Sequence, residues 1–172
     1  MRRTAALGVC LAALVLPAAV SAMVAGPGDG SLVVKAASGP RTGNVPVVTL
    51  TITGAAIGHV DQGHIVIDNG ATAEVTQGTG ILWRKDVKNS DTAQMWGGTD
   101  FKFRAVGGKY TILIFGSGVD VVALGTGTVT FTGLVDDPRN DGTYSLNGKA
   151  FLSLPGVTGK QLTIGSTTSS NG

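Results

Sequence analysis

The chain has 172 residues, of which 42% are hydrophobic, and a formal charge of +2. Lysine and arginine number 13 against 11 acidic residues and form no run longer than two, at Arg2-Arg3 and at Arg84-Lys85. The composition therefore excludes the basic surface that nucleic acid requires. A single cysteine excludes an internal disulfide.

The first 22 residues have the three-part pattern of a secretory signal peptide. Arg2 and Arg3 form a positive region, residues 7–16 are apolar apart from Gly8, and small residues lead to Ala22. The apolar run is shorter than the roughly 20 residues that span a bilayer, which disfavours the alternative of an uncleaved anchor. We therefore predict cleavage after Ala22 and export to the cell envelope or the medium. The mature chain would have no cysteine, equal numbers of acidic and basic residues, and no transmembrane segment.

The rest of the chain is predicted as one all-β domain at residues 31–165, between a flexible segment at 23–30 and a disordered polar tail at 166–172. No stretch has helical apolar spacing. Short runs rich in Val, Ile, Thr and Phe alternate with Gly, Asn, Asp and Pro, as in an antiparallel β-barrel or β-sandwich, and the pattern leaves both open. The strands are expected near residues 31–37, 45–53, 56–61, 63–68, 71–76, 80–86, 100–106, 109–115, 119–124, 127–132, 143–147, 149–154 and 161–164.

Two turn sequences predict hairpins with defined registers. A turn at Gly107-Gly108 would place Phe103 opposite Ile112. The inward face of that hairpin would carry Phe101, Phe103, Ala105, Tyr110, Ile112 and Ile114. A turn at Asn147-Gly148, the strongest short hairpin signal, would place Tyr144 opposite Phe151.

Residues 97–165 carry a pattern of turn glycines and alternating strands. It includes Gly-Gly-Thr-Asp-Phe-Lys-Phe-Arg from Gly97, Gly-Ser-Gly-Val-Asp-Val-Val from Gly116, and Asp-Gly-Thr-Tyr-Ser-Leu-Asn-Gly from Asp141. Together with Gly-His-Val-Asp-Gln-Gly from Gly58, this pattern resembles a family of secreted or envelope proteins of actinobacterial type with no established activity. The resemblance implies an exported all-β protein and assigns no residue a role.

The two histidines lie close together in the sequence. His59 and Asp61 would share one face of a strand, and a turn at Gln62-Gly63 could return His64 toward them. Imidazole and carboxylate groups suit zinc, so these three residues are a candidate metal site. The alternative is a strand that ends in a turn and carries two partly exposed histidines. No cofactor is otherwise expected.

Two further segments are candidates for binding. Trp83, Met95 and Trp96 lie in or beside the longest interval without strand alternation, and could form a binding lip or plug one end of the fold. The acid-rich segment Asp136–Gly142 could bind calcium through its oxygens, but it does not have EF-hand spacing and also fits a solvated turn.

No recognisable catalytic set is present. Ser117 lacks a nucleophile elbow, and Asp100 and Asp120, or Glu74, would need a partner acid as in glycosidases. The preferred function is a non-enzymatic exported module that binds an envelope or extracellular partner or has a structural role. The alternatives are a barrel that carries a small apolar ligand and a small hydrolase or metal-binding protein. A core filled by Phe101, Phe103, Ile112 and Phe131 would argue against the carrier.

Overall fold

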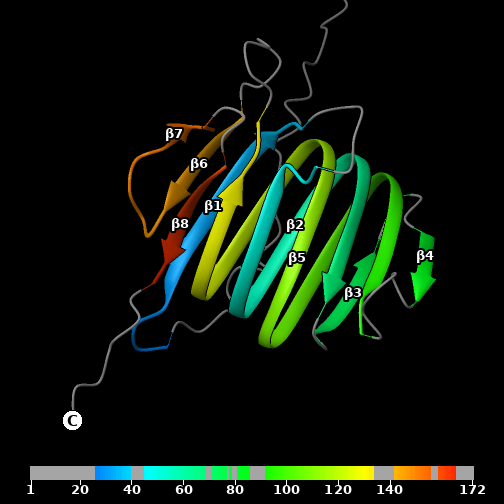
Figure 1. Ribbon diagram of the computed structural model, residues 1–172, viewed down its shortest axis with the longest axis horizontal. Coiled ribbons are helices and arrows are strands. Elements are labelled where there is room, and N and C mark those ends of the chain that lie inside the picture. The colour runs from blue at the N-terminus through cyan, green and yellow to red at the C-terminus, as the bar shows by residue number, and fades with distance from the viewer. Residues whose placement is uncertain are drawn as a thin grey trace, which may run out of the picture.

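The computed structural model describes residues 26–39, 45–68, 71–76, 78, 81–85, 92–133, 142–155 and 159–165, with the backbone alone for 81–85. The described chain is all-β, as predicted, and forms one antiparallel sheet that is not closed into a barrel. Figure 1 shows its elements. They are β1 (Gly30–Ala37), β2 (Val48–Asp68), β3 (Thr72–Thr76), β4 (Ile81–Lys85), β5 (Gln94–Phe131), β6 (Thr143–Leu146), β7 (Leu152–Ser153) and β8 (Lys160–Ile164).

Two very long strands make the centre of the sheet. β5 winds into a helical coil, and β2 runs antiparallel to it between successive turns of the coil. β2 therefore has a segment of β5 on each side (Figure 1). Leu50, for example, pairs with Ile112 on one side and with Val129 on the other. Most residues of β2 are therefore paired on both sides with segments of one continuous strand.

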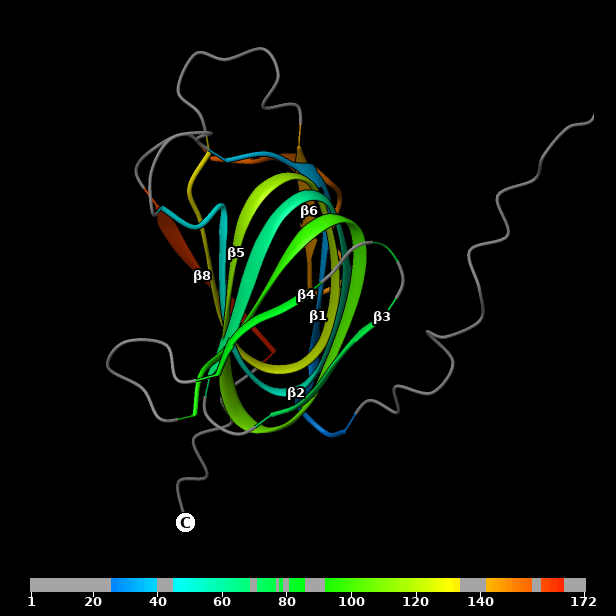
Figure 2. The ribbon, with the colours of Figure 1, turned by 90° about the vertical axis from the view of Figure 1, so that its right-hand side faces the viewer.

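The coil is flattened into two layers, which Figure 2 shows as the two sides of an oval. Layer one has the order β7, β6, β1, β5 (119–125), β2 (54–60), β5 (101–106) and β3. Layer two has the order β8, β5 (127–131), β2 (48–53), β5 (109–114), β2 (64–68), β5 (94–97) and β4. The architecture is thus a single sheet folded over on itself.

Glycines occupy the positions where the strands bend from one layer to the other. At one edge Gly54 pairs with both Gly107 and Gly125, and Gly125 also pairs with Gly30; at the opposite edge Gly63 pairs with Gly98 and Gly116. Gly54 has a φ of 142° and Gly116 a φ of 132°, values that L-residues with side chains rarely adopt. A side chain at Gly54 would also overlap the carbonyl oxygen of Leu124 on the neighbouring strand. Gly54 and Gly116 therefore occupy positions that need a residue without a Cβ.

The core lies between the two layers and is one hydrophobic cluster. Alternate residues of each strand point inward, and the largest fully buried side chains include Tyr110, Phe101, Phe131, Leu50 and Ile112. The inward face predicted for residues 101–114 is confirmed, because all six of its members are at most 2% exposed.

The hairpin predicted at Gly107-Gly108 is wrong. β5 continues through both glycines, and Gly107 pairs with Gly54 of β2 instead of closing a turn. Phe103 and Ile112 therefore lie in different layers and face the same core from opposite sides. Alternation along the chain is the same in both arrangements, which explains why the inward face was correct although the connection was not.

The turn at Asn147-Gly148 is confirmed, with a small change of register. Both residues have positive φ values, 52° and 71°, as a two-residue hairpin turn requires, and the Lys149 N–H donates to the Leu146 carbonyl at 3.1 Å. Beyond the turn the register slips by one residue, so that Tyr144 pairs with Leu152 and not with Phe151.

Residues 26–29, within the segment predicted to be flexible, form a turn closed by a hydrogen bond from the Asp29 N–H to the Gly26 carbonyl. The predicted signal peptide (1–22) and polar tail (166–172) lie outside the described residues. Within the described part of the chain, no helix is long and apolar enough to cross a membrane.

Tyr110 ties the core to one glycine edge. Its ring is fully buried, and its hydroxyl donates to the carbonyls of Ala105 at 3.0 Å and Gly54 at 3.3 Å. Burial raises the pKa of this hydroxyl to about 12, although a backbone hydrogen bond at Ala56 acts in the opposite direction. The neutral phenol is the form that the fold keeps.

We predict that this phenol contributes to alkaline unfolding. An unfolded tyrosine ionises near pH 10, so the free energy of unfolding should fall as the pH rises from about 10 toward 12, because only the unfolded chain releases this proton easily. Tyr110→Phe should cost about 1–3 kcal/mol at neutral pH by leaving buried carbonyls without a donor, and should be less sensitive to alkali. Urea unfolding at a series of pH values tests this; parallel losses in both proteins would contradict it.

Candidate functional site

His59 lies on the outer face of layer one between two carboxylates. It belongs to β2, where its inward neighbour Val60 is fully buried, and its own side chain is 25% exposed. Nε2 lies 2.8 Å from Oδ1 of Asp100, and Nδ1 lies 3.6 Å from Oδ1 of Asp61. Both ring nitrogens of His59 therefore lie next to carboxylate oxygens, and the contact with Asp100 is a hydrogen bond.

The backbone around His59 adopts unusual conformations. Asp100 has a φ of 53° and Ala36 a φ of 52°, a region that is uncommon for residues other than glycine and is found more often at functional sites. Asp120 pairs with His59 across the strands and accepts a hydrogen bond from the Ala36 N–H at 2.8 Å. We refer to His59, Asp61, Asp100 and Asp120 as the His59 corner.

The predicted metal ligands do not come together in one place. Asp61 lies beside His59, but His64 follows the bend at Gly63 and belongs to layer two. There its ring stacks on Phe115, with the centroids 4.3 Å apart and the planes at 9°. Among the residues that the structure describes, no group of three or more His, Cys, Asp or Glu side chains could hold a metal ion.

Burial lowers the pKa of His64 below the ordinary histidine value. The folded chain therefore keeps this ring neutral, while the unfolded chain takes up a proton as the pH falls through about 6.5. We predict that the melting temperature falls as the pH is lowered from neutral through this value. His64→Phe, which can keep the stack on Phe115, should show a weaker acid dependence. Scanning fluorimetry of both proteins tests this, and equal acid slopes would contradict it.

Of the proposed binding lip, the structure describes the side chains of Met95 and Trp96. Trp96 is 7% exposed and belongs to the hydrophobic core, where it pairs with Ile65. Met95 is the next residue along the strand and so points to the opposite face, half-buried. Trp83 lies in β4 at an irregularity of the register between Leu82 and Arg84, and its side chain is outside the described part. Trp96 thus acts in packing.

The remaining candidates are distributed over the fold. Residues 136–141 of the proposed calcium loop lie outside the described residues. Glu74 pairs across strands with Arg104. Asp100 is hydrogen-bonded to His59, and Asp120 accepts from the Ala36 N–H.

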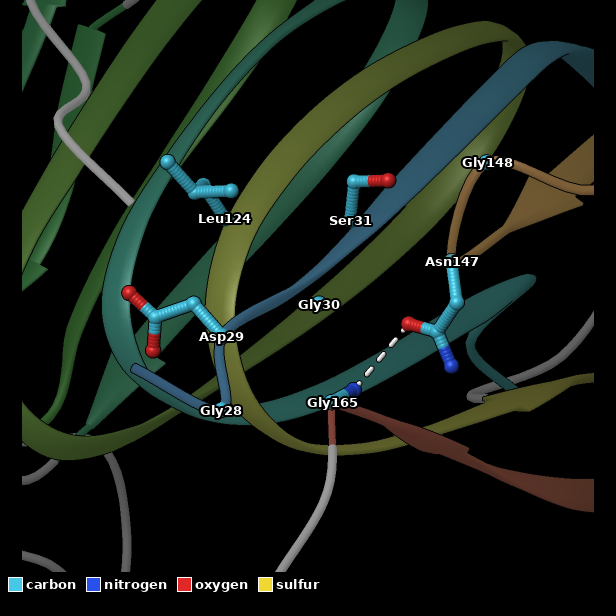
Figure 3. Close-up of a pocket in the computed structure, with 8 residues that line it drawn as sticks. All are labelled: Gly28, Asp29, Gly30, Ser31, Leu124, Asn147, Gly148 and Gly165. Carbon is cyan, nitrogen blue, oxygen red and sulfur yellow. Dashed lines mark hydrogen bonds between the residues drawn. The ribbon is translucent and has the colours of Figure 1, made fainter. Parts of the chain in front are cut away.

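An open depression of about 500 Å³ lies where the start of β1, the turn after β6 and the end of β8 meet. Figure 3 shows its lining, in which the carboxamide of Asn147 reaches Gly165. Oδ1 of Asn147 accepts from the Gly165 N–H at 3.0 Å, and Nδ2 donates to the Thr163 carbonyl at 3.4 Å. The residues that line the depression are Gly28, Asp29, Gly30, Ser31, Leu124, Asn147, Gly148 and Gly165.

Sequence reasoning found part of these sites. It placed His59 and Asp61 together because they are two residues apart on one strand. It did not connect Asp100 to His59, since 41 residues separate them, nor did it connect Asn147 to β8. The Asn-Gly dipeptide indicated the turn but gave no sign of the side chain's partners.

No family model, curated protein or solved structure matches this chain. The resemblance to actinobacterial envelope proteins therefore stays a prediction.

Proposed function

We propose that the chain is an exported, non-enzymatic binding or structural module that acts through its outer surface. The observation that carries this proposal is the filled core. Phe101, Ile112 and Phe131 are fully buried, Phe103 is 2% exposed, and all four belong to one cluster between the layers. A carrier would need an interior cavity lined by such residues, whereas the described depression lies outside the core, and half of the residues that line it are glycines.

The His59 corner is the surface that we propose contacts the partner. Its acids are exposed, with Asp100 at 83% and Asp61 at 66%, yet they are oriented by an imidazole and by backbone held at positive φ. Orientation before binding lowers the entropic cost of association. The same contacts disfavour hydrolysis as the function, because both ring nitrogens of His59 face carboxylates and neither faces a nucleophile in the contacts described.

Export, suggested by the predicted signal peptide, makes the cell envelope the first place to look for a partner. The purified chain should co-sediment with isolated envelopes of an actinobacterial host. His59→Gln and Asp100→Asn should reduce that retention, while Glu74→Gln, a charge-removing change on β3 of the same layer, should not. Equal retention of all three variants would overturn the assignment of the corner, and no retention of the parent chain would overturn the envelope partner.

The carrier alternative has its own test. Native mass spectrometry of the purified chain should give the bare mass of one chain or a multiple, and the fluorescent apolar probe anilinonaphthalene sulfonate should bind weakly. Phe103→Ala, which removes a buried ring and opens a cavity, is the positive control and should bind the probe more strongly. A stoichiometric apolar ligand on the parent chain would favour the carrier and contradict the proposal.

A further inference from the structure

The Asn147 side chain connects two elements that are distant in sequence. Asn147 and Gly148 form the exposed turn after β6, and the Asn147 carboxamide is directed away from the turn onto the end of β8 (Figure 3). Both of its polar atoms are used there, one by the Gly165 N–H and one by the Thr163 carbonyl. The two hydrogen bonds of the Asn147 side chain therefore form only while β8 lies against this turn.

An asparagine followed by glycine is chemically labile, since glycine offers the least hindrance to attack by its own backbone nitrogen. In that step the Gly148 nitrogen bonds to Cγ of Asn147, the bond from Cγ to Nδ2 breaks, and the amide proton leaves with ammonia. Water then opens the cyclic imide to give aspartate or isoaspartate at position 147. No oxidant, metal or enzyme is required.

We propose that Asn147 is a deamidation site whose reactivity is gated by the docking of β8. Ring closure requires Cγ to turn onto the nitrogen of the next residue, so the hydrogen bonds to Thr163 of β8 and to Gly165 directly after it must first break. Because Oδ1 of Asn147 also fills the space where a Gly30 side chain would lie, the docked carboxamide is enclosed on that side. Docked β8 protects the residue, and released β8 exposes it to attack.

The product should make release of β8 more favourable. A carboxylate at position 147 can still accept from the Gly165 N–H, but it has no proton to donate to the Thr163 carbonyl and places two acceptors together. Isoaspartate adds a backbone atom to a two-residue turn and breaks its geometry. The modification would thus mark chains in which β8 has opened, and an exported protein would accumulate the mark over time. This inference is independent of the proposed function.

The test compares deamidation rates by peptide-mapping mass spectrometry. The parent chain is incubated in neutral buffer, and a synthetic peptide of residues 143–151 gives the rate of the unprotected sequence. Two variants of the full chain are incubated in the same way. Leu162→Asp places a charge at a half-buried β8 position packed on the core, and Gln161→Asp is an exposed β8 control. We expect the parent chain and Gln161→Asp to react at least about tenfold more slowly than the peptide, because local opening must precede reaction. Leu162→Asp should approach the peptide rate.

A parent chain that deamidates as fast as the peptide would overturn the proposal, as would equal rates in Leu162→Asp and Gln161→Asp. If Leu162→Asp does not fold, hydrogen exchange on Asn147→Asp replaces it. That variant carries the product side chain, and the backbone amides of residues 160–164 should exchange faster than in the parent while those of β2 do not. Unchanged exchange in β8 would overturn the claim that docking and the carboxamide are coupled.

Discussion

Replacing Gly54 by alanine is expected to remove most of the stability of the fold. Gly54 has a φ of 142°, a region that is essentially restricted to glycine and costs other residues about 1–3 kcal/mol. The added Cβ would also meet the Leu124 carbonyl and the Gly125 Cα, both backbone atoms of the adjacent strand that cannot move aside as a side chain would. We expect a loss of about 4 kcal/mol or more in the free energy of unfolding. Single substitutions reach this size only through a few mechanisms, of which backbone strain at an unusual φ is one.

Gly108 provides the matched control for this prediction. It lies on β5 beside Gly107, the register partner of Gly54, but no atom lies within 4 Å of a Cβ built there. Its φ is outside the positive region, so Gly108→Ala should change stability by about 0.5 kcal/mol or less, or stabilise slightly by restricting the unfolded chain. Urea unfolding of both variants gives the comparison. Equal stabilities of the two variants would contradict the position of Gly54 at a bend between the layers.

The second large loss of stability is expected when Phe101 is replaced by alanine. This ring is fully buried between the layers, and its strand neighbour across the ladder is Val60, also fully buried. Phe101→Ala removes apolar contacts and leaves a cavity that a rigid two-layer core fills only partly, at an expected cost of about 3–5 kcal/mol.

Phe151 is the control residue of the same type. Its side chain is 48% exposed on the loop before β7, and its main described contact is with the Lys35 ammonium, 5.0 Å from the ring centroid. Such an exposed cation–π contact contributes about 0.5–1 kcal/mol, so Phe151→Ala should be far milder. Denaturant unfolding gives the free energy of unfolding of both variants. Similar losses in Phe101→Ala and Phe151→Ala would contradict the location of the core between the layers.

Much of the local structure could be predicted from sequence because it depends on neighbours along the chain. The alternation from Phe101 to Ile114 identified the inward face, and Asn147-Gly148 identified a turn that needs two positive φ values. Local patterns of this kind are independent of which strand lies alongside. Burial of Trp96 could not be predicted in this way, because the interval before it showed no strand alternation and left a binding lip and a plug both open.

The connectivity could not be predicted for the same reason. A glycine pair such as Gly107-Gly108 satisfies a tight hairpin and a bend between layers equally well, and only the pairing of Gly54 with both Gly107 and Gly125 distinguishes them. That pairing joins residues more than fifty positions apart. The His59 corner has the same origin, because Asp100 and Asp120 approach His59 from two successive turns of β5.

The coil also explains how the proposed contact surface is made. Successive turns of β5 lie on either side of β2, so that Asp100 from one turn contacts the His59 imidazole and Asp120 from the other is the register partner of His59. Positive φ at Asp100 directs its carboxylate onto Nε2. A rigid sheet can thus present an arranged polar group on its outside while its interior stays filled with apolar side chains.

The central claim, that β2 lies between two turns of a continuous β5, is tested most directly by disulfide cross-linking in a Cys10→Ser background. Thr51 and Thr111 are register partners with their Oγ1 atoms 3.0 Å apart, so Thr51→Cys with Thr111→Cys should form a disulfide under mild oxidation. Arg104 would face Thr111 in a hairpin at Gly107-Gly108, but the two lie in different layers, so Arg104→Cys with Thr111→Cys should stay reduced. Cross-linking of the second pair and not of the first would contradict the coiled arrangement.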